Sequence, residues 1–342
     1  MPVTLVEVAA RAGVSPATVS RVLNGNYPVA ESTRQRVEQA VRELDYVVNA
    51  HARALLHATS GIVGVILNDA SDPFFAGIAR GIQGAAAETS RLSVICNSEG
   101  DPEQEFAFLD LLRGHRADAV ILVGAAPEDE EYRAAATARA KGLRSSGTRL
   151  VLCGRPAPAD DAPGDVVTID NEAGSTAITR HLVELGHRRI AYVTGPDGRS
   201  TTTARLAGFR AALAEAGLAV DENLVVHGDF SRQAGREAVE NLLAAGRDFT
   251  AVLAANDLVA AGAVSALRTA GYRIPDDVSV AGYDNLPTAV DVWPNLTTVH
   301  VPLEEIGRKA VELAFGSADG QAVVTVPTEL VVRDSTAGPA AG

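Results

Sequence analysis

The hydrophobic positions of the chain follow two periods, which change near residue 61. Before it, apolar residues recur at spacings of three and four, as in helices that bury one face. After it, short apolar runs alternate with amphipathic stretches such as 74–87 and 103–113, which is typical of buried parallel strands covered by helices. The expected strands are 62–67, 92–96, 119–123, 150–153, 166–169, 190–194, 224–226, 251–254 and 278–281. We therefore expect a helical N-terminal region followed by an α/β body with two similar subdomains.

Residues 4–24 predict two short helices joined by a tight turn. The apolar face of the first helix consists of Leu5, Val8, Ala9 and Ala12. Thr4 can cap this helix with its hydroxyl, and Glu7 three positions later completes the pattern of a capping box. Gly13 then supplies the unusual backbone conformation that a tight turn requires.

The second helix should begin with a cap from Ser15 and with Pro16 in its first turn, where no amide hydrogen bond is lost. Its inward positions are Val19, Val22 and Leu23, and its outward positions are Pro16, Ala17, Ser20 and Arg21. Two helices at this spacing are typical of the helix-turn-helix, whose second helix enters the major groove of DNA. An ordinary helical hairpin is the alternative interpretation.

The sequence Val-Ser-Pro-Ala-Thr-Val-Ser-Arg-Val-Leu-Asn at residues 14–24 resembles the recognition helix of the LacI/GalR (lactose-repressor/galactose-repressor) family of bacterial transcription regulators. The resemblance continues through Tyr46 to about residue 334. It implies three parts: a three-helix helix-turn-helix head at 1–46, a linker with a hinge helix at 47–60, and an effector-binding and dimerisation body at 61–334 that is similar to periplasmic sugar-binding proteins.

Within the body, the resemblance implies three crossings between the subdomains, near Asp170, His300 and Ala322. Subdomain one would comprise 61–170 and 300–321, and subdomain two would comprise 171–299 and 322–334. The last residues, 335–342, are rich in glycine, alanine and proline, and we expect them to form a disordered tail.

The resemblance also implies roles for the outward residues of the head. Arg21 would read a guanine edge or hold a phosphate. Pro16 and Ala17 occupy base-discriminating positions, and because their side chains cannot hydrogen-bond, they would read bases by apolar contact or shape. The residues expected at phosphates are Thr4, Ser15, Thr18, Ser20 and Asn24.

A third helix is expected over 31–44, capped by Ser32 or Glu31. Its inward residues would be Val37, Val41 and Leu44. Three short helices bury only a small core, so the head should be marginally stable alone.

The linker contains good helix formers but no neighbouring core, and an isolated helix this short does not persist in water. In the family, this segment folds where two copies meet over the DNA minor groove. The resemblance places Leu55 as the apolar wedge in the central base step, with Asn49 and Ala52 also at the DNA. Val48 and His51 depart from the family's pattern, so we expect a hinge that is less pre-ordered or that responds to pH. The alternative is a flexible tether whose leucines pack on the body.

The net charge of −13 is unusual for a DNA-binding protein, but it is unevenly distributed. Residues 1–60 carry six arginines and five acidic residues, which leaves −14 on the rest of the chain. A head with outward arginines can meet phosphates, whereas the acidic body is repelled by DNA and limits non-specific binding.

The remaining composition is that of a globular protein without a membrane segment. No apolar run reaches the about 18 residues that a membrane span requires, and the N-terminus has no basic-then-apolar signal segment, so a cytoplasmic protein is expected. Cys96 and Cys153 fall in predicted strands and should be reduced core thiols. Two lone cysteines make neither a disulfide framework nor a zinc site.

Ligands of open parallel sheets bind beyond the carboxyl ends of the strands, and two facing sheets share one cleft there. The candidate effector residues therefore follow predicted strands: Phe74, Phe75, Arg199, Thr201, Arg205, Phe230, Asn256, Asp257 and Asp284. Phe74 would be an apolar wall for a sugar ring or a base, and Phe75 would be shared with the core. The resemblance directs Arg199, Thr201 and Arg205 toward the ligand.

Several of these residues have a plainer alternative. Arg199 and Arg205 could be solvated residues at a helix start, Asp257 could be a helix cap, and Asp284 could bond its own backbone in a turn. The stretch 195–205 lacks the spacing and the lysine of a nucleotide-binding phosphate loop. No catalytic or metal-ligating constellation converges on the cleft, so we expect no enzymatic activity, no metal and no cofactor.

The combined expectation is a dimeric transcription repressor that binds an inverted-repeat DNA operator, with a tetramer as the alternative assembly. A small-molecule effector would switch it, with a sugar favoured because most of the family senses one. The alternatives are a purine or nucleoside, which the set of cleft residues also fits, and a protein co-regulator. Whether the effector acts as inducer or co-repressor is left open.

Overall fold

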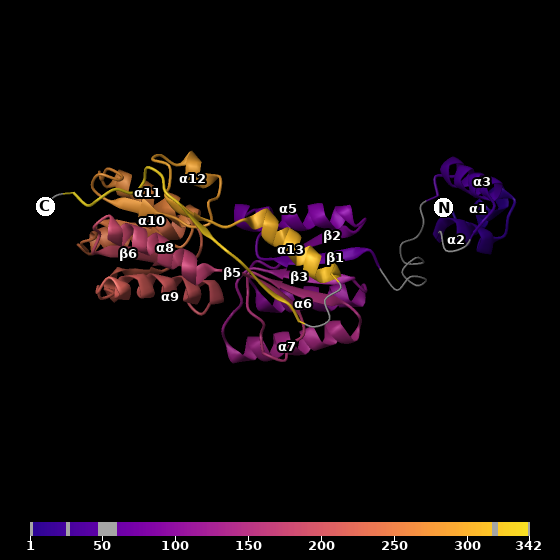
Figure 1. Cartoon of the computed structure of the whole chain (residues 1–342), viewed down its shortest axis with the longest axis horizontal. Helices are drawn as coiled ribbons and strands as arrows, with labels where there is room; N and C mark the ends of the chain where they lie inside the picture. The colour runs from indigo at the N-terminus through magenta and orange to yellow at the C-terminus, as the bar shows by residue number, and fades with distance from the viewer. Residues whose placement is uncertain (1–2, 25–27, 47–59, 317–320, 341–342) are drawn as a thin grey trace. The chain divides into compact units, whose positions relative to one another are not determined.

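A computed structural model of the chain describes residues 3–24, 28–46, 60–316 and 321–340. The chain divides into two compact units, residues 1–60 and residues 61–342, called the head and the body below and described separately (Figure 1). The predicted hinge residues Asn49, Ala52 and Leu55, like Val48 and His51, lie outside the described residues. Their roles therefore stay predictions.

The head contains α1 (Leu5–Ala12), α2 (Pro16–Asn24) and α3 (Glu31–Glu43). The predicted capping box is confirmed, because Glu7 N donates to Thr4 Oγ1 at 3.4 Å and Thr4 N donates to Glu7 Oε2 at 2.7 Å. Gly13 has a φ of 66°, as a left-handed turn residue should. The predicted Ser15 cap is also confirmed, since its hydroxyl accepts from Thr18 N at 3.2 Å.

The third helix differs from the prediction at its start. Its N-cap is Ala30, which makes no side-chain capping bond, so the expectation of a cap from Ser32 or Glu31 is wrong. Both residues already lie inside the first helical turn. Within residues 3–24 and 28–46, the fully buried core of the head is small and consists of Val8, Ala9, Ala12, Val19, Val37 and Ala40.

The first sheet of the body has six parallel strands in the order β11-β5-β4-β3-β1-β2. Their bounds are β1 (Ile62–Leu67), β2 (Leu92–Asn97), β3 (Ala119–Val123), β4 (Arg149–Cys153), β5 (Asp165–Ile169) and β11 (Val323–Val326). The covering helices are α5 (Pro73–Glu88) and α13 (Leu303–Phe315) on one face, and α6 (Pro102–Gly114) and α7 (Glu130–Ser145) on the other (Figure 1). Successive residues of β1 reflect this, because Val65 packs with α5 and α13 while Ile66 packs with α6 and α7.

The second sheet is built in the same way, with parallel strands in the order β7-β6-β8-β9. Its strands are β6 (Ile190–Thr194), β7 (Val225–His227), β8 (Ala251–Ala254) and β9 (Ser279–Ala281). Its helices are α8 (Asn171–Glu184), α9 (Ser200–Glu215), α10 (Arg232–Ala244) and α11 (Asp257–Thr269), with the short η1 (Glu222–Leu224) and α12 (Thr288–Asp291). The predicted body of two α/β subdomains with parallel sheets is confirmed.

The third crossing between the subdomains lies later than predicted. Residues 322–326 were expected in subdomain two, but β11 pairs in parallel with β5 of the first sheet. The edge of β5 explains this difference, because Val166 N donates to Ala322 O at 2.8 Å and Asp170 N to Val326 O at 3.1 Å. The chain crosses after Val326, and β12 (Glu329–Val331) then pairs antiparallel with β10 (Thr298–His300).

The predicted disorder of the tail is wrong for residues 335–340. Val280 N donates to Ser335 O at 2.8 Å, and Thr297 N donates to the hydroxyl of the fully buried Ser335 at 2.8 Å. His187 Nε2 donates to the carbonyl of Ala337 at 2.8 Å. The segment is ordered because its backbone satisfies polar groups beside β9 that would otherwise lack partners.

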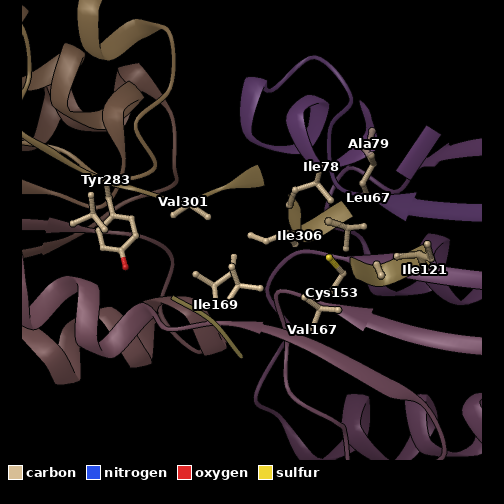
Figure 2. Close-up of a cluster of buried hydrophobic side chains, with 14 of the residues drawn as sticks. Leu67, Ile78, Ala79, Ile121, Cys153, Val167, Ile169, Tyr283, Val301 and Ile306 are labelled. Carbon is tan, nitrogen blue, oxygen red and sulfur yellow. The ribbon is translucent and has the colours of Figure 1, made fainter. Parts of the chain in front are cut away.

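One hydrophobic cluster runs through both subdomains. Figure 2 shows Ile169 and Val301 between Tyr283, on the side of the second sheet, and Ile306 and Ile78, on the side of the first. The two subdomains therefore share buried apolar surface where the chain crosses between them.

Candidate functional site

A cavity of about 210 Å³ lies between the two subdomains of the body. Its lining residues follow the carboxyl ends of strands in both sheets, where parallel sheets bind ligands. Seven of the nine predicted effector residues line it: Phe74, Phe75, Thr201, Arg205, Phe230, Asn256 and Asp284. Their contact with an effector stays a prediction, but the geometry brings them to one site.

Arg205, on the first turns of α9, is the most constrained polar side chain of the cavity. It is 3% exposed, and its guanidinium stacks 3.6 Å from the ring centroid of Tyr283. Nε donates to Asn171 Oδ1 at 2.8 Å, and Nη2 donates to Asp284 Oδ1 at 2.9 Å. Nη1 donates to the carbonyl of Ala255. These bonds fix the guanidinium before any ligand arrives.

Asp284 lies shortly after β9, following Gly282 and Tyr283, and has a φ of 93°. Burial raises the pKa of its carboxyl, and the guanidinium of Arg205 opposes that rise by favouring the ionised form. The two side chains form a buried ion pair at the wall of the cavity. Each of these two predicted effector residues is therefore already partnered by the other.

The aromatic wall comes from α5 and from the end of β7. Phe74 and Phe75 meet edge to face, with ring centroids 5.3 Å apart. Asp72 begins their helix, accepting from Phe74 N at 2.8 Å. Opposite them, the ring of Phe230 lies so close to Gly195 that a Cβ there would approach it to 2.3 Å. Glycine at this position is therefore required for the observed place of the ring.

Asp257 does not reach the cavity, which corrects its place among the effector residues. Its carboxylate accepts from Leu286 N and from Thr298 Oγ1, both at 2.6 Å. Burial raises the pKa of Asp257 to about 7. Nor is Asp257 the helix cap, since Asn256 fills that role by accepting from Val259 N. Asp257 is thus a structural residue that ties the start of α11 to the segments after β9.

Arg199 is also absent from the cavity wall formed by the described residues. Its Nη2 donates to the carbonyl of Gly100, at 3.5 Å, in the other subdomain. Its backbone bridges to Pro127, and Ser200 N donates to Ala126 O at 3.1 Å. Arg199 therefore belongs to a contact between the subdomains beside the cavity.

Sequence reasoning missed several polar residues of the cavity, chiefly Asn68, Asp69, Asp72 and Asn171. The first three follow β1 and the fourth follows β5, so the position after a predicted strand was the available signal. The acidic residues Asp69 and Asp72 stand just before the aromatic residues at 74–75, in the same segment after β1.

On the head, the outward residues predicted for α2 are accessible. Thr4, Ser15, Pro16, Ala17 and Arg21 are exposed, and Thr18 and Ser20 are partly exposed. Such a mixture of hydroxyls, small apolar groups and an arginine can contact both phosphates and base edges. The side chain of Asn24 lies outside the described residues.

Three further points concern only the residues that the structure describes: metal-ligating clusters, membrane-spanning helices and the two cysteines. Within them, no cluster of three or more histidine, cysteine or acidic residues could hold a metal ion. None of the described helices is long and apolar enough to cross a membrane. Cys96 and Cys153 are free and buried, as predicted, and burial raises the pKa of Cys153 to about 12.

Comparison with known proteins agrees with this two-part architecture. Residues 4–49 match the family described as bacterial regulatory proteins, lacI family. Residues 60–333 match the family described as periplasmic binding proteins and sugar binding domain of LacI family. The transcriptional regulator CelR of Thermobifida fusca is 36% identical over 341 residues, covering 97% of this chain and 98% of CelR.

Two solved structures are similar along nearly the whole chain. The structure of a CelR–cellobiose complex has a TM-score of 0.71 at 34% identity, covering 97% of this chain and 99% of that one. The lac repressor dimer bound to operator and the anti-inducer ONPF has a TM-score of 0.85 at 28% identity, covering 98% and 100%. Such relatives are regulators and not enzymes, and this chain belongs to the LacI family of DNA-binding transcription regulators.

Proposed function

We propose that this regulator is a repressor that binds an inverted-repeat operator as a homodimer and is switched by a sugar held in the cavity between its subdomains. The two-sided lining of that cavity carries the proposal. Phe74 and Asp72 come from subdomain one, whereas Arg205 and Asp284 come from subdomain two. A ligand that contacts both sides favours one arrangement of the subdomains, and only such differential binding can shift a conformational equilibrium.

The chemistry of the cavity supports a sugar. An aromatic wall facing a few fixed polar groups suits a ring with apolar faces and hydroxyls on its rim. The related CelR forms a complex with cellobiose. A purine base or nucleoside is the second candidate, because Phe74 and Phe230 could stack a base while Asp284 accepts from its N–H groups. A protein co-regulator is the third.

On the DNA side, α2 would enter the major groove, with Arg21 at a guanine edge or a phosphate and with Pro16 and Ala17 at bases. Thr4, Ser15, Thr18, Ser20 and Asn24 would hold phosphates, and Asn49, Ala52 and Leu55 would act in the minor groove. The lac repressor dimer on its operator supports the homodimer, with a tetramer as the alternative. A regulator acting on bacterial DNA would work in the cytoplasm.

The test begins with a thermal-shift panel of sugars, sugar phosphates, nucleosides and purine bases on the whole protein. A one-site ligand at 100 times its Kd should add about 2.7 kcal/mol of stability. The compound that binds should then change operator affinity at fixed salt. Binding without a change in operator affinity would contradict the switch, and a purine hit would replace the sugar.

Two substitutions separate the two sites. Phe74→Ala should weaken effector binding. Arg21→Ala should weaken operator binding and reduce the slope of log affinity against log salt concentration by about 1. Leu111→Ala, at a position on α6 that is 53% exposed and outside both sites, should change neither. An Arg21→Ala protein with unaltered operator affinity would contradict the role proposed for α2.

A further inference from the structure

The charges around the cavity point to the class of ligand that it can accept. Its described ionisable lining residues are three aspartates, Asp69, Asp72 and Asp284, and one arginine, Arg205. Three carboxylates outnumber one guanidinium, so the ionised lining is acidic, and an anionic ligand could bind favourably only by pairing with the arginine. The partners of each group therefore decide the outcome.

Arg205 has little positive charge to offer. Asp284 neutralises it at 2.9 Å, and both side chains are at most 4% exposed. Its other nitrogens donate to Asn171 and Ala255, and its face is covered by Tyr283. To pair with Arg205, an anionic ligand would have to displace the carboxylate of Asp284. That carboxylate would then stay buried without a counterion, which costs free energy.

The two aspartates of subdomain one, Asp69 and Asp72, form no ion pair with any cation that the structure describes. No ion pair joins Asp69 or Asp72 to any described lysine, arginine or histidine of the body. Asp72 Oδ1 accepts from Phe74 N, and Asp69 Oδ1 accepts from the backbone and hydroxyl of Ser71. Burial raises the pKa of Asp72, and the carboxylates of Asp284 and Asp69 raise it further. At the cavity, the carboxylate of Asp72 thus has no paired cation among the described residues, whereas the charge of Asp284 is balanced by Arg205.

We propose that the cavity selects an uncharged ligand rich in hydroxyl groups and rejects ligands that carry a phosphate. Hydroxyls can donate to Asp72 on one side and to Asp284 on the other, which joins the two subdomains through the ligand. A phosphate adds negative charge beside the carboxylates of Asp69 and Asp72, and no unpaired cation among the described lining residues offsets the repulsion. This inference rests on the proposed function, because it concerns the ligand of the same cavity.

The test uses matched pairs that differ only in the phosphate: glucose and glucose 6-phosphate, ribose and ribose 5-phosphate, and adenosine and its 5′-monophosphate. Binding to the whole protein is measured by calorimetry at constant pH and ionic strength. For every pair whose uncharged member binds, the phosphorylated member should bind at least about 30-fold more weakly. A phosphorylated member that binds as tightly as its partner would overturn the inference while leaving an effector site in place. Failure of every pair to bind would overturn the sugar and nucleoside proposals together with this inference.

Substitutions then assign the discrimination to the carboxylates. Asp72→Asn keeps an oxygen that can cap α5 but removes the charge. The ratio between the Kd values of the phosphorylated and the uncharged member of a pair should therefore fall by about 3-fold to 10-fold. Asp101→Asn is the matched control, because Asp101 caps α6 in the same way, accepting from Glu103 N at 2.9 Å, and does not line the cavity. Asp69→Asn, at an exposed residue that caps no helix, provides a second variant if Asp72→Asn does not fold. If both single variants fold and neither changes this ratio of Kd values, the role proposed for these carboxylates is overturned.

Discussion

The head and the body of this chain bury cores of very different size. Among the residues of the head that the structure describes, the fully buried ones are three valines and three alanines. The body buries side chains as large as Tyr283 and Phe209 within clusters that span both faces of its sheets. Because stabilisation scales with the apolar area removed from water, each valine of the head contributes a large share of its stability. DNA binding and ligand binding should therefore fail separately.

The two units also differ in where they hold their ion pairs. The head places Arg11 with Glu43 and Arg34 with Glu31 at accessible positions. The body contains the buried pairs Arg205–Asp284 and Arg155–Glu105. Exposed pairs contribute little to stability, whereas removal of one partner of a buried pair leaves an uncompensated charge. Breaking one of these ion pairs should therefore cost more stability in the body than in the head.

The largest effect should come from Arg205→Met. This change leaves the carboxylate of Asp284 buried without its cation and should lower the free energy of unfolding of the body by about 3–5 kcal/mol. The chain's single tryptophan, Trp293, lies in the body, so its fluorescence during urea denaturation reports that unit. The control is Arg180→Met, which breaks an exposed pair with Glu215. Equal denaturation midpoints for the two variants would contradict the contrast between buried and exposed pairs.

A smaller effect, confined to the other unit, is expected for Val19→Ala. Val19 is fully buried between the helices of the head, and its truncation should cost about 2 kcal/mol. Hydrogen exchange across residues 3–24 should accelerate and operator affinity should fall, while Trp293 fluorescence shows an unchanged body. Val6→Ala, at a position that is 63% exposed, is the matched control. A body destabilised as much as the head would mean that the two units do not fold independently.

The sheets could be predicted from sequence because buried parallel strands are continuous apolar runs. The run at 62–67, for example, coincides with β1. The errors lie where pairing depends on a distant edge. Residues 323–326 pair with β5, and the backbone of Ser335 hydrogen-bonds to β9. Neither segment has a local sequence pattern that predicts which strand it contacts.

The site shows the same division between local and distant information. Position after a strand pointed to Phe74 and Asp284, and the family resemblance pointed to Arg205; all three line one cavity. It could not show that Arg205 and Asp284 neutralise each other, because that pairing depends on the fold of α9 against the end of β9. It also failed for Asp257, whose carboxylate accepts from Leu286 N and Thr298 Oγ1 and does not line the cavity.

The smallest effect tests the head through its capping box. Thr4→Ala removes the hydroxyl that caps α1 and should destabilise the head by about 1 kcal/mol.

Hydrogen bonds from the backbone N–H and hydroxyl of Thr4 lower the pKa of Glu7 below its ordinary 4.5. A lowered carboxyl pKa stabilises the folded head above pH 4.5, and this contribution is lost as the pH falls through the lowered value. Hydrogen exchange of α1 between pH 6 and pH 3 should therefore show a smaller acid-induced loss of protection in Glu7→Gln than in the parent, after correction for intrinsic exchange. Glu38→Gln, an exposed carboxylate on α3, should keep the parent's pH dependence. If Glu7→Gln also kept it, the capping box would not contribute to the pH dependence of the head.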